Sequence, residues 1–130
     1  MTIAAWCLFA FFIIAYLPRV GSNRGAIAQE GTYDNITPRV QQQRLTGAGA
    51  RAQAAHQNAL EAFAPFAAAI WAAHAFGVDA LVRDSLAAAF VGLRLVYWYA
   101  YMKDWGNGRS IVWALAWLII AALFVLAGLG

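Results

Sequence analysis

The sequence predicts an all-α integral membrane protein that crosses the bilayer four times as a bundle of helices. Of its 130 residues, 63% are hydrophobic and only 12% are charged, which leaves too few charged side chains to coat a water-soluble domain. The apolar residues also fall into long blocks, as expected where lipid surrounds the chain. We therefore expect residues 1–130 to form a single transmembrane domain.

The first expected span covers about residues 2–18 and carries no charge before Arg19. It is slightly short for about 30 Å of hydrocarbon at about 1.5 Å per residue, but Arg19 can extend to the membrane surface. A cleaved signal peptide is the alternative, since residues 26–28 read Ala-Ile-Ala. Such a peptide has Lys or Arg before its apolar run, and this chain has none there.

The next stretch, residues 19–50, is rich in Gly, Asn, Thr and Pro and indicates a loop. A helix is expected to begin near its end, between Pro38 and Thr46. The remaining expected spans are an Ala-rich segment, a segment that ends in an aromatic cluster, and an uncharged segment, at about residues 51–76, 80–102 and 110–129.

Basic side chains predict the orientation of these spans. Two expected loops carry seven of them, namely Arg19, Arg24, Arg39, Arg44, Arg51, Lys103 and Arg109, whereas the other side of the membrane has only Arg83. By the positive-inside rule, both termini face away from the cytoplasm. The net charge of +3 is thus explained by topology, and we expect no nucleic-acid partner. The single cysteine excludes a disulfide within one chain.

Two charged side chains, Glu61 and Arg94, fall inside expected spans. Each costs about 2.5–3.5 kcal/mol to insert, so each is expected to face protein or a water-filled cavity. Helical spacing places further polar groups on the same faces. The two faces are Arg51, Asn58 and Glu61 on the second span, and Arg94, Tyr97 and Tyr101 on the third.

These polar faces allow two interpretations. In one, Glu61 and Arg94 pair with each other and lock two helices together. In the other, they border a cleft that opens to the cytoplasm. Four short helices seldom enclose a pocket alone, and the many Ala residues of the second span permit close helix approach. A homo-oligomer with sites between subunits is therefore expected. No metal-ligand spacing, phosphate loop or nucleophile elbow is present in the sequence.

Two motifs resemble the MAPEG family, the membrane-associated proteins in eicosanoid and glutathione metabolism. Residues 55–66, AHQNALEAFAPF, match the family's second-helix segment R-A-H-x-N-x-x-E-x-x-x-P-F from its Ala onward. In the glutathione-using members, the third helix ends with an Arg seven residues before a Tyr, as Arg94 stands before Tyr101. A catalytic Arg follows that Tyr by seven to nine residues, and Arg109 follows Tyr101 by eight. The chain is most similar to short bacterial-type members.

This resemblance implies a homotrimer of four-helix subunits, in the bacterial inner membrane, with glutathione bound as co-substrate between neighbours near the cytoplasmic face. Arg109 would be catalytic and would stabilise the glutathione thiolate. The other implied glutathione-binding residues are Arg51, Asn58 and Glu61, together with Arg94, Tyr97 and Tyr101 on the neighbouring wall. A hydrophobic electrophile or lipid hydroperoxide would enter from the membrane, and the reaction would be conjugation or peroxide reduction.

The chain departs from the family pattern at Ala54, where a basic residue is common; Arg51, nearly one helical turn away, is a candidate substitute. A different class of function is a non-catalytic lipid-binding or scaffold protein, in which the polar faces serve assembly alone. A small transporter or channel is a third class, but one Glu and one Arg make a poor conduction path.

Overall fold

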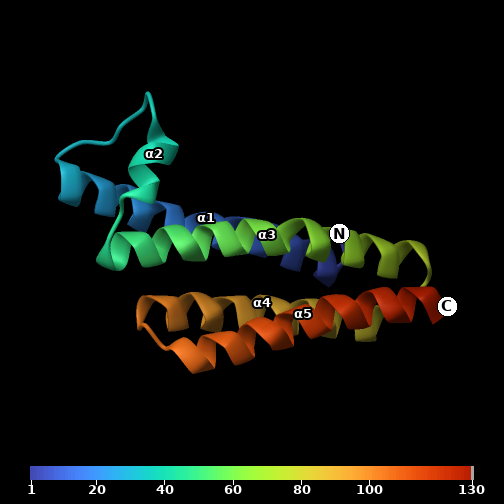
Figure 1. The fold of residues 1–130 in the computed structure, drawn as a ribbon. Coiled ribbons are helices and arrows are strands. Elements are labelled where there is room, and N and C mark those ends of the chain that lie inside the picture. The colour runs from blue at the N-terminus through green and yellow to red at the C-terminus, as the bar shows by residue number, and fades with distance from the viewer. Residues whose placement is uncertain (130) are drawn as a thin grey trace.

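The computed structural model describes residues 1–129, which form five helices and contain no strand. The helices are α1 (Ile3–Glu30), α2 (Pro38–Gln43), α3 (Gly47–Ala75), α4 (Ala80–Met102) and α5 (Gly106–Leu129). The predicted all-α class is therefore confirmed. The four long helices run along a common direction, and α2 stands apart at one end, away from both termini (Figure 1). By length and composition, α1 and α5 are apolar enough to cross a membrane.

Aromatic side chains form the centre of the packed helices. Phe11, Phe66 and Phe90 come from α1, α3 and α4, and all three are fully buried. The Phe66 and Phe90 rings stack with centroids 3.9 Å apart, and the Phe11 ring meets Phe90 edge-on at 5.0 Å. Such aromatic pairs add about 0.5–1.5 kcal/mol beyond the burial of their area. These three rings hold α1, α3 and α4 together.

The loop predicted for residues 19–50 is wrong over its first part, because α1 continues through Pro18 to Glu30. Proline removes one backbone donor, and regular helical hydrogen bonding resumes after it. Polar side chains then stabilise the extension: Ser22 Oγ donates to Gln53 Oε1 of α3 at 2.7 Å, and Gln29 Nε2 donates to the Arg44 carbonyl at 2.8 Å. Ser22 thus bonds to α3, and Gln29 bonds to the residue that ends α2. Gly31, in the left-handed region at φ 80°, ends the helix.

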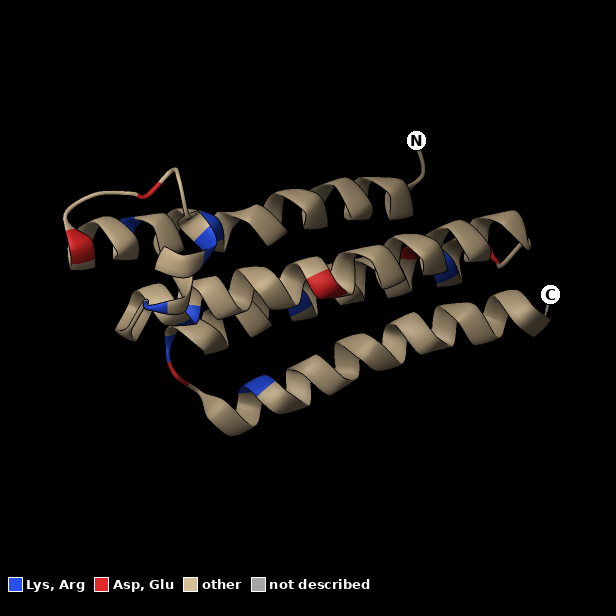
Figure 2. Cartoon of the chain, turned by 45° about the horizontal axis from the view of Figure 1, so that its top comes forward, with Lys and Arg blue, Asp and Glu red and all other residues tan. Residues whose placement is uncertain are grey.

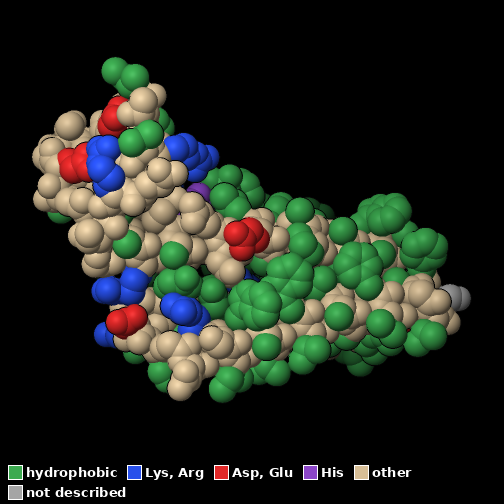
Figure 3. All heavy atoms as spheres, viewed as in Figure 1, with side chains coloured by type: hydrophobic (Ala, Val, Ile, Leu, Met, Phe, Trp, Pro, Cys, Tyr) green, Lys and Arg blue, Asp and Glu red, His purple; other side chains and the backbone are tan. Residues whose placement is uncertain are grey.

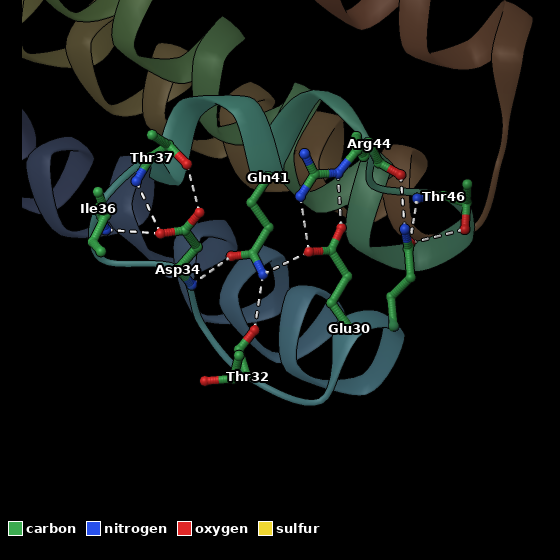
Figure 4. Close-up of polar contacts among 9 residues, drawn as sticks. Glu30, Thr32, Asp34, Ile36, Thr37, Gln41, Arg44 and Thr46 are labelled. Carbon is green, nitrogen blue, oxygen red and sulfur yellow. Dashed lines mark hydrogen bonds and ion pairs between the residues drawn. The ribbon is translucent and has the colours of Figure 1, made fainter.

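A network of polar contacts joins the end of α1 to α2 (Figure 4). Glu30 and Arg44 form an ion pair at 3.0 Å, and Gln41 Nε2 donates to the Thr32 carbonyl at 2.8 Å. Asp34 accepts from the Thr37 hydroxyl and backbone N–H, and these hydrogen bonds lower the pKa of its carboxyl. We call this assembly, residues 19–46, the headpiece.

Charged side chains gather at the headpiece end of the molecule. Lys and Arg lie mainly at the end that carries α2, whereas the long body of the helices is largely uncharged (Figure 2). The space-filling view shows the same contrast, with hydrophobic side chains covering most of the body (Figure 3). This distribution fits a headpiece in water beside helices in lipid. That the headpiece side is cytoplasmic stays a prediction.

The crossing of α1 and α3 depends on two glycines, which gives a stability prediction. A Cβ added to Gly25 would lie 2.6 Å from the Cα of Gly49, closer than real Cβ atoms approach backbone. We expect Gly25→Ala to force the helices apart and to lower stability by about 1–3 kcal/mol, measured as a lower midpoint of thermal unfolding in detergent. Gly92→Ala is the matched control, since a Cβ there meets nothing within 4 Å. Equal midpoints for the two variants would contradict this close crossing.

Candidate functional site

A short connection between α4 and α5 brings two of the predicted site residues together. The helix α4 ends at Met102 and α5 begins at Gly106, so only three residues link them. Tyr101 therefore lies in the last turn of α4, and Arg109 in the first turn of α5. The Arg109 Cζ atom sits 4.4 Å from the centroid of the Tyr101 ring, the geometry of a cation–π contact.

The same face of α4 continues this contact inward as a series of stacked groups. The Tyr97 and Tyr101 rings meet edge-on with centroids 5.3 Å apart, because they are four residues apart on one helix. One turn deeper, the Arg94 Cζ atom lies 4.4 Å from the Tyr97 ring centroid. Arg94, Tyr97, Tyr101 and Arg109 thus form a continuous ladder of two cations and two rings. We call these four residues the α4–α5 ladder.

The ladder is joined to α3 through Asn58. Arg94 Nη2 donates a hydrogen bond to Asn58 Oδ1 at 2.8 Å. Arg94 is only 2% exposed, and its Nε and Nη1 atoms have no hydrogen-bond partner within residues 1–129. The centroid of the Phe11 ring also lies 5.6 Å from the guanidinium carbon. A buried guanidinium of this kind is held by ring faces and one amide oxygen.

The ion pair between Glu61 and Arg94, one of the two interpretations of the sequence, does not form in residues 1–129. Glu61 is exposed on α3 and makes no hydrogen bond or ion pair with the described residues. Asn58, which is three residues before it, takes the place beside Arg94. The polar face of α3 is therefore divided, with Asn58 turned toward α4 and Glu61 turned outward.

Arg51 lies apart from the other predicted site residues. It is half-buried near the start of α3, and its Nε atom is buried without a partner in the described part of the chain. Seven residues separate it from Asn58, which is about 10 Å along the helix. Five of the seven predicted residues are thus connected through contacts in one subunit, and Arg51 and Glu61 are not.

A pocket opens on the outer part of the ladder. It has a volume of about 440 Å³ and is lined by Tyr97, Tyr101, Arg109, Ser110, Trp113 and Ala114. This volume is within the range of about 300–1,000 Å³ that is usual for small-molecule sites. The pocket offers one guanidinium and three hydroxyl groups beside the Trp113 ring. It can hold a polar molecule and place an anionic atom next to Arg109.

Ser110 was not expected in the site from the sequence. Helical spacing was the available signal: Trp113 and Ala114 follow Ser110 by three and four residues, so the three residues share one face of α5. Without the pairing of α4 with α5, this face cannot be distinguished from the lipid-facing side of an apolar helix.

A comparison with protein families decides the relationship that these residues suggested. The model of the MAPEG family matches residues 3–129, nearly the whole chain. The chain belongs to the MAPEG family. Members of this family include glutathione transferases and peroxidases, and membership together with the two apolar helices makes the chain a membrane protein. Comparisons with curated proteins and with solved structures gave no match.

Proposed function

We propose that the protein is a glutathione-dependent membrane transferase or peroxidase that acts on a hydrophobic electrophile or a lipid hydroperoxide. The observation that carries this proposal is the pocket in which the Arg109 guanidinium lies over Tyr101, in a member of a family associated with glutathione. Glutathione would be the co-substrate, and Arg109 would be the catalytic residue.

The chemistry required of Arg109 is stabilisation of an anion. A thiol with a pKa of about 8.5 is mostly protonated at neutral pH, and the thiolate is the nucleophile. A guanidinium beside the sulfur favours the thiolate by charge and by hydrogen bonding. In conjugation, the sulfur lone pair attacks the electrophilic carbon and the leaving group departs with the bonding electrons. In peroxide reduction, the thiolate sulfur attacks the terminal peroxide oxygen and the O–O bond breaks; the alkoxide that leaves takes a proton from solvent, so that an alcohol and a sulfenic acid result. The thiol of a second glutathione then attacks the sulfenic sulfur and yields the disulfide and water.

The remaining candidate residues are suited to the polar groups of the tripeptide. The phenol groups of Tyr97 and Tyr101 line the pocket beside Arg109. Asn58 and Arg94 orient the inner end of the ladder through their hydrogen bond. Glu61 and Arg51 have unpaired polar atoms in residues 1–129, and we propose that they bind the amine and a carboxylate of glutathione. The Trp113 ring would contact the hydrophobic substrate.

A homotrimer accounts for the exposure of Glu61. A carboxylate that faces lipid inside a span costs about 2.5 kcal/mol or more, and Glu61 is exposed on the isolated chain. We propose that a neighbouring subunit covers this face, so that Glu61 of one subunit and the Arg109 pocket of the next border one site. In this arrangement α1, α3, α4 and α5 each contain one span, both termini are non-cytoplasmic, and the membrane is the bacterial inner membrane.

Thermal unfolding of the purified protein in detergent tests glutathione binding. A ligand that binds only the folded state stabilises it by RT ln(1 + [L]/Kd), which is about 2.7 kcal/mol at a hundredfold excess over Kd. We expect millimolar glutathione to raise the unfolding midpoint of the wild type. Glu61→Gln should shrink this shift because the carboxylate partner of the ligand amine is lost.

Glu30→Gln is the matched control, since Glu30 pairs with Arg44 in the headpiece and does not line the pocket. It should keep the full glutathione shift even where its own midpoint is lower. The absence of any shift in the wild type would overturn the proposed function.

A non-catalytic lipid-binding or scaffold protein is the second candidate, because the hydrogen bond between Asn58 and Arg94 can also serve structure alone. This bond lies within one subunit and joins α3 to α4, so it is equally suited to holding the fold. On this candidate, Asn58→Ala and Arg94→Ala dissociate the oligomer, and no thiol ligand is detected. Size-exclusion with mass determination, on the sample used for the glutathione melts, distinguishes the two.

A further inference from the structure

The indole ring of Trp105 rests directly on Gly108 at the start of α5. A Cβ added to Gly108 would lie 2.6 Å from Trp105 Cδ2 and 2.7 Å from Cζ2, and would also collide with Cε2. These three atoms belong to one indole ring system, so the ring lies against the Gly108 backbone and fills the space that a side chain at position 108 would need. At Gly106, two residues earlier, an added Cβ meets nothing within 4 Å. The requirement for glycine is therefore specific to position 108.

The backbone of Trp105 joins the same two helices. Its N–H donates to the Ala100 carbonyl of α4 at 2.9 Å, and its carbonyl accepts the Arg109 N–H of α5 at 3.0 Å. Asp104, just before it, adopts the left-handed conformation at φ 56°, which turns the chain between the helices. Trp105 thus holds the end of α4 through one backbone bond and the first turn of α5 through another, with its ring seated on that turn.

This turn carries the residue that the proposed function makes catalytic. Arg109 directly follows Gly108, and its guanidinium lies over the Tyr101 ring at 4.4 Å. A displacement of the first turn of α5 moves the Arg109 Cα by the same amount. Misplacement of a reacting group by about 1 Å can reduce a rate by about a hundredfold. The contact of the Trp105 ring with the Gly108 backbone therefore restricts the position of the Arg109 guanidinium.

We propose that Trp105 is a positioning residue for Arg109: its ring, seated on Gly108, fixes the first turn of α5 so that the guanidinium meets the substrate thiolate. This inference rests on the proposed function and adds to it a residue that does not line the pocket. Of the two glycines in the first turn of α5, Gly106 and Gly108, only Gly108 is expected to affect catalysis.

The test compares Gly108→Ala with Gly106→Ala, two identical changes in one turn. For each purified variant, the ultraviolet absorbance of the glutathione thiolate is followed against pH, and kcat and KM are measured with a reactive aromatic electrophile. We expect Gly108→Ala to raise the pKa of the bound thiol and to lower kcat at least about tenfold, with a small change in KM. Gly106→Ala should match the wild type in all three quantities.

Trp105→Ala provides a second variant that tests the same contact from the other side. It should raise the thiol pKa as Gly108→Ala does, and adding Gly108→Ala to it should have no further effect, because the colliding ring is gone. Wild-type thiol pKa and kcat in both single variants would overturn this inference alone, as would losses that add in the double variant. A wild-type protein that forms no thiolate would overturn the proposed function and this inference with it.

Discussion

Arg109→Ala is expected to lower kcat by about 100- to 1,000-fold, the usual effect of removing one donor that stabilises a developing or bound anion. The Arg109 guanidinium lies beside Tyr101 and lines the pocket, and within residues 1–129 no other cationic side chain lines it. Without it, the bound thiol should return toward its ordinary pKa of about 8.5. The variant should therefore show no thiolate absorbance at neutral pH, measured by ultraviolet difference spectra with glutathione.

The pH dependence of the rate shows whether Arg109 lowers the pKa of the bound thiol. A wild-type thiol with a lowered pKa is already ionised at neutral pH, so its rate should be flat from there upward. The rate of Arg109→Ala should instead rise as the pH approaches about 8.5. Lys103→Ala is the control, since Lys103 lies near the Tyr99 ring at 5.8 Å and not in the pocket. Unchanged thiolate absorbance in Arg109→Ala would contradict the role of this residue.

Arg94→Met is expected to reduce glutathione affinity at least about tenfold, or about 1.4 kcal/mol, while the protein stays folded. Methionine keeps much of the volume but removes the charge, and replacing a buried ion by an apolar residue of similar size is often neutral for stability. The loss of affinity follows because Asn58 loses its hydrogen-bond donor and Tyr97 loses the cation over its ring. Calorimetric titration with glutathione measures this change.

A comparison with Arg94→Ala separates binding from folding. The alanine leaves a cavity beside Phe11 and Tyr97, and we expect its unfolding midpoint to fall by an amount equivalent to about 2–5 kcal/mol. If Arg94→Met bound glutathione as tightly as the wild type, the role of Arg94 in the glutathione site would be contradicted. If both variants dissociated the oligomer, the scaffold function would be favoured.

The long helices could be predicted from the sequence because apolar blocks and short polar turns define them. The extension of α1 could not, because Gly21, Gly25 and the polar residues around them have the composition of a loop. They are helical because Ser22 bonds to Gln53 and Gly25 meets Gly49. These contacts are made with residues about 25 to 30 positions further along the chain. Local composition therefore gave the wrong structure where tertiary packing decides.

The candidate site, too, could be predicted from the sequence only in part. Helical spacing alone places Arg94, Tyr97 and Tyr101 on one face, and the structure brings these residues into contact. The partner of Arg94 was not predictable, because Asn58 and Glu61 are about 60° apart around α3 and either side chain could have reached it. Which one turns toward α4 depends on the rotation of α3 about its own axis, set by packing of Phe66 and the Ala residues.

An experimental density map of the wild-type protein in a lipid nanodisc, with glutathione added, tests most directly whether Arg109 holds the thiolate. We predict density for the tripeptide between two subunits, with the sulfur within hydrogen-bond distance of the Arg109 guanidinium and Glu61 of the adjacent subunit near the ligand. A map in which the sulfur of the bound glutathione contacts other residues would contradict this mechanism, as would a map without glutathione density in which Glu61 faces lipid.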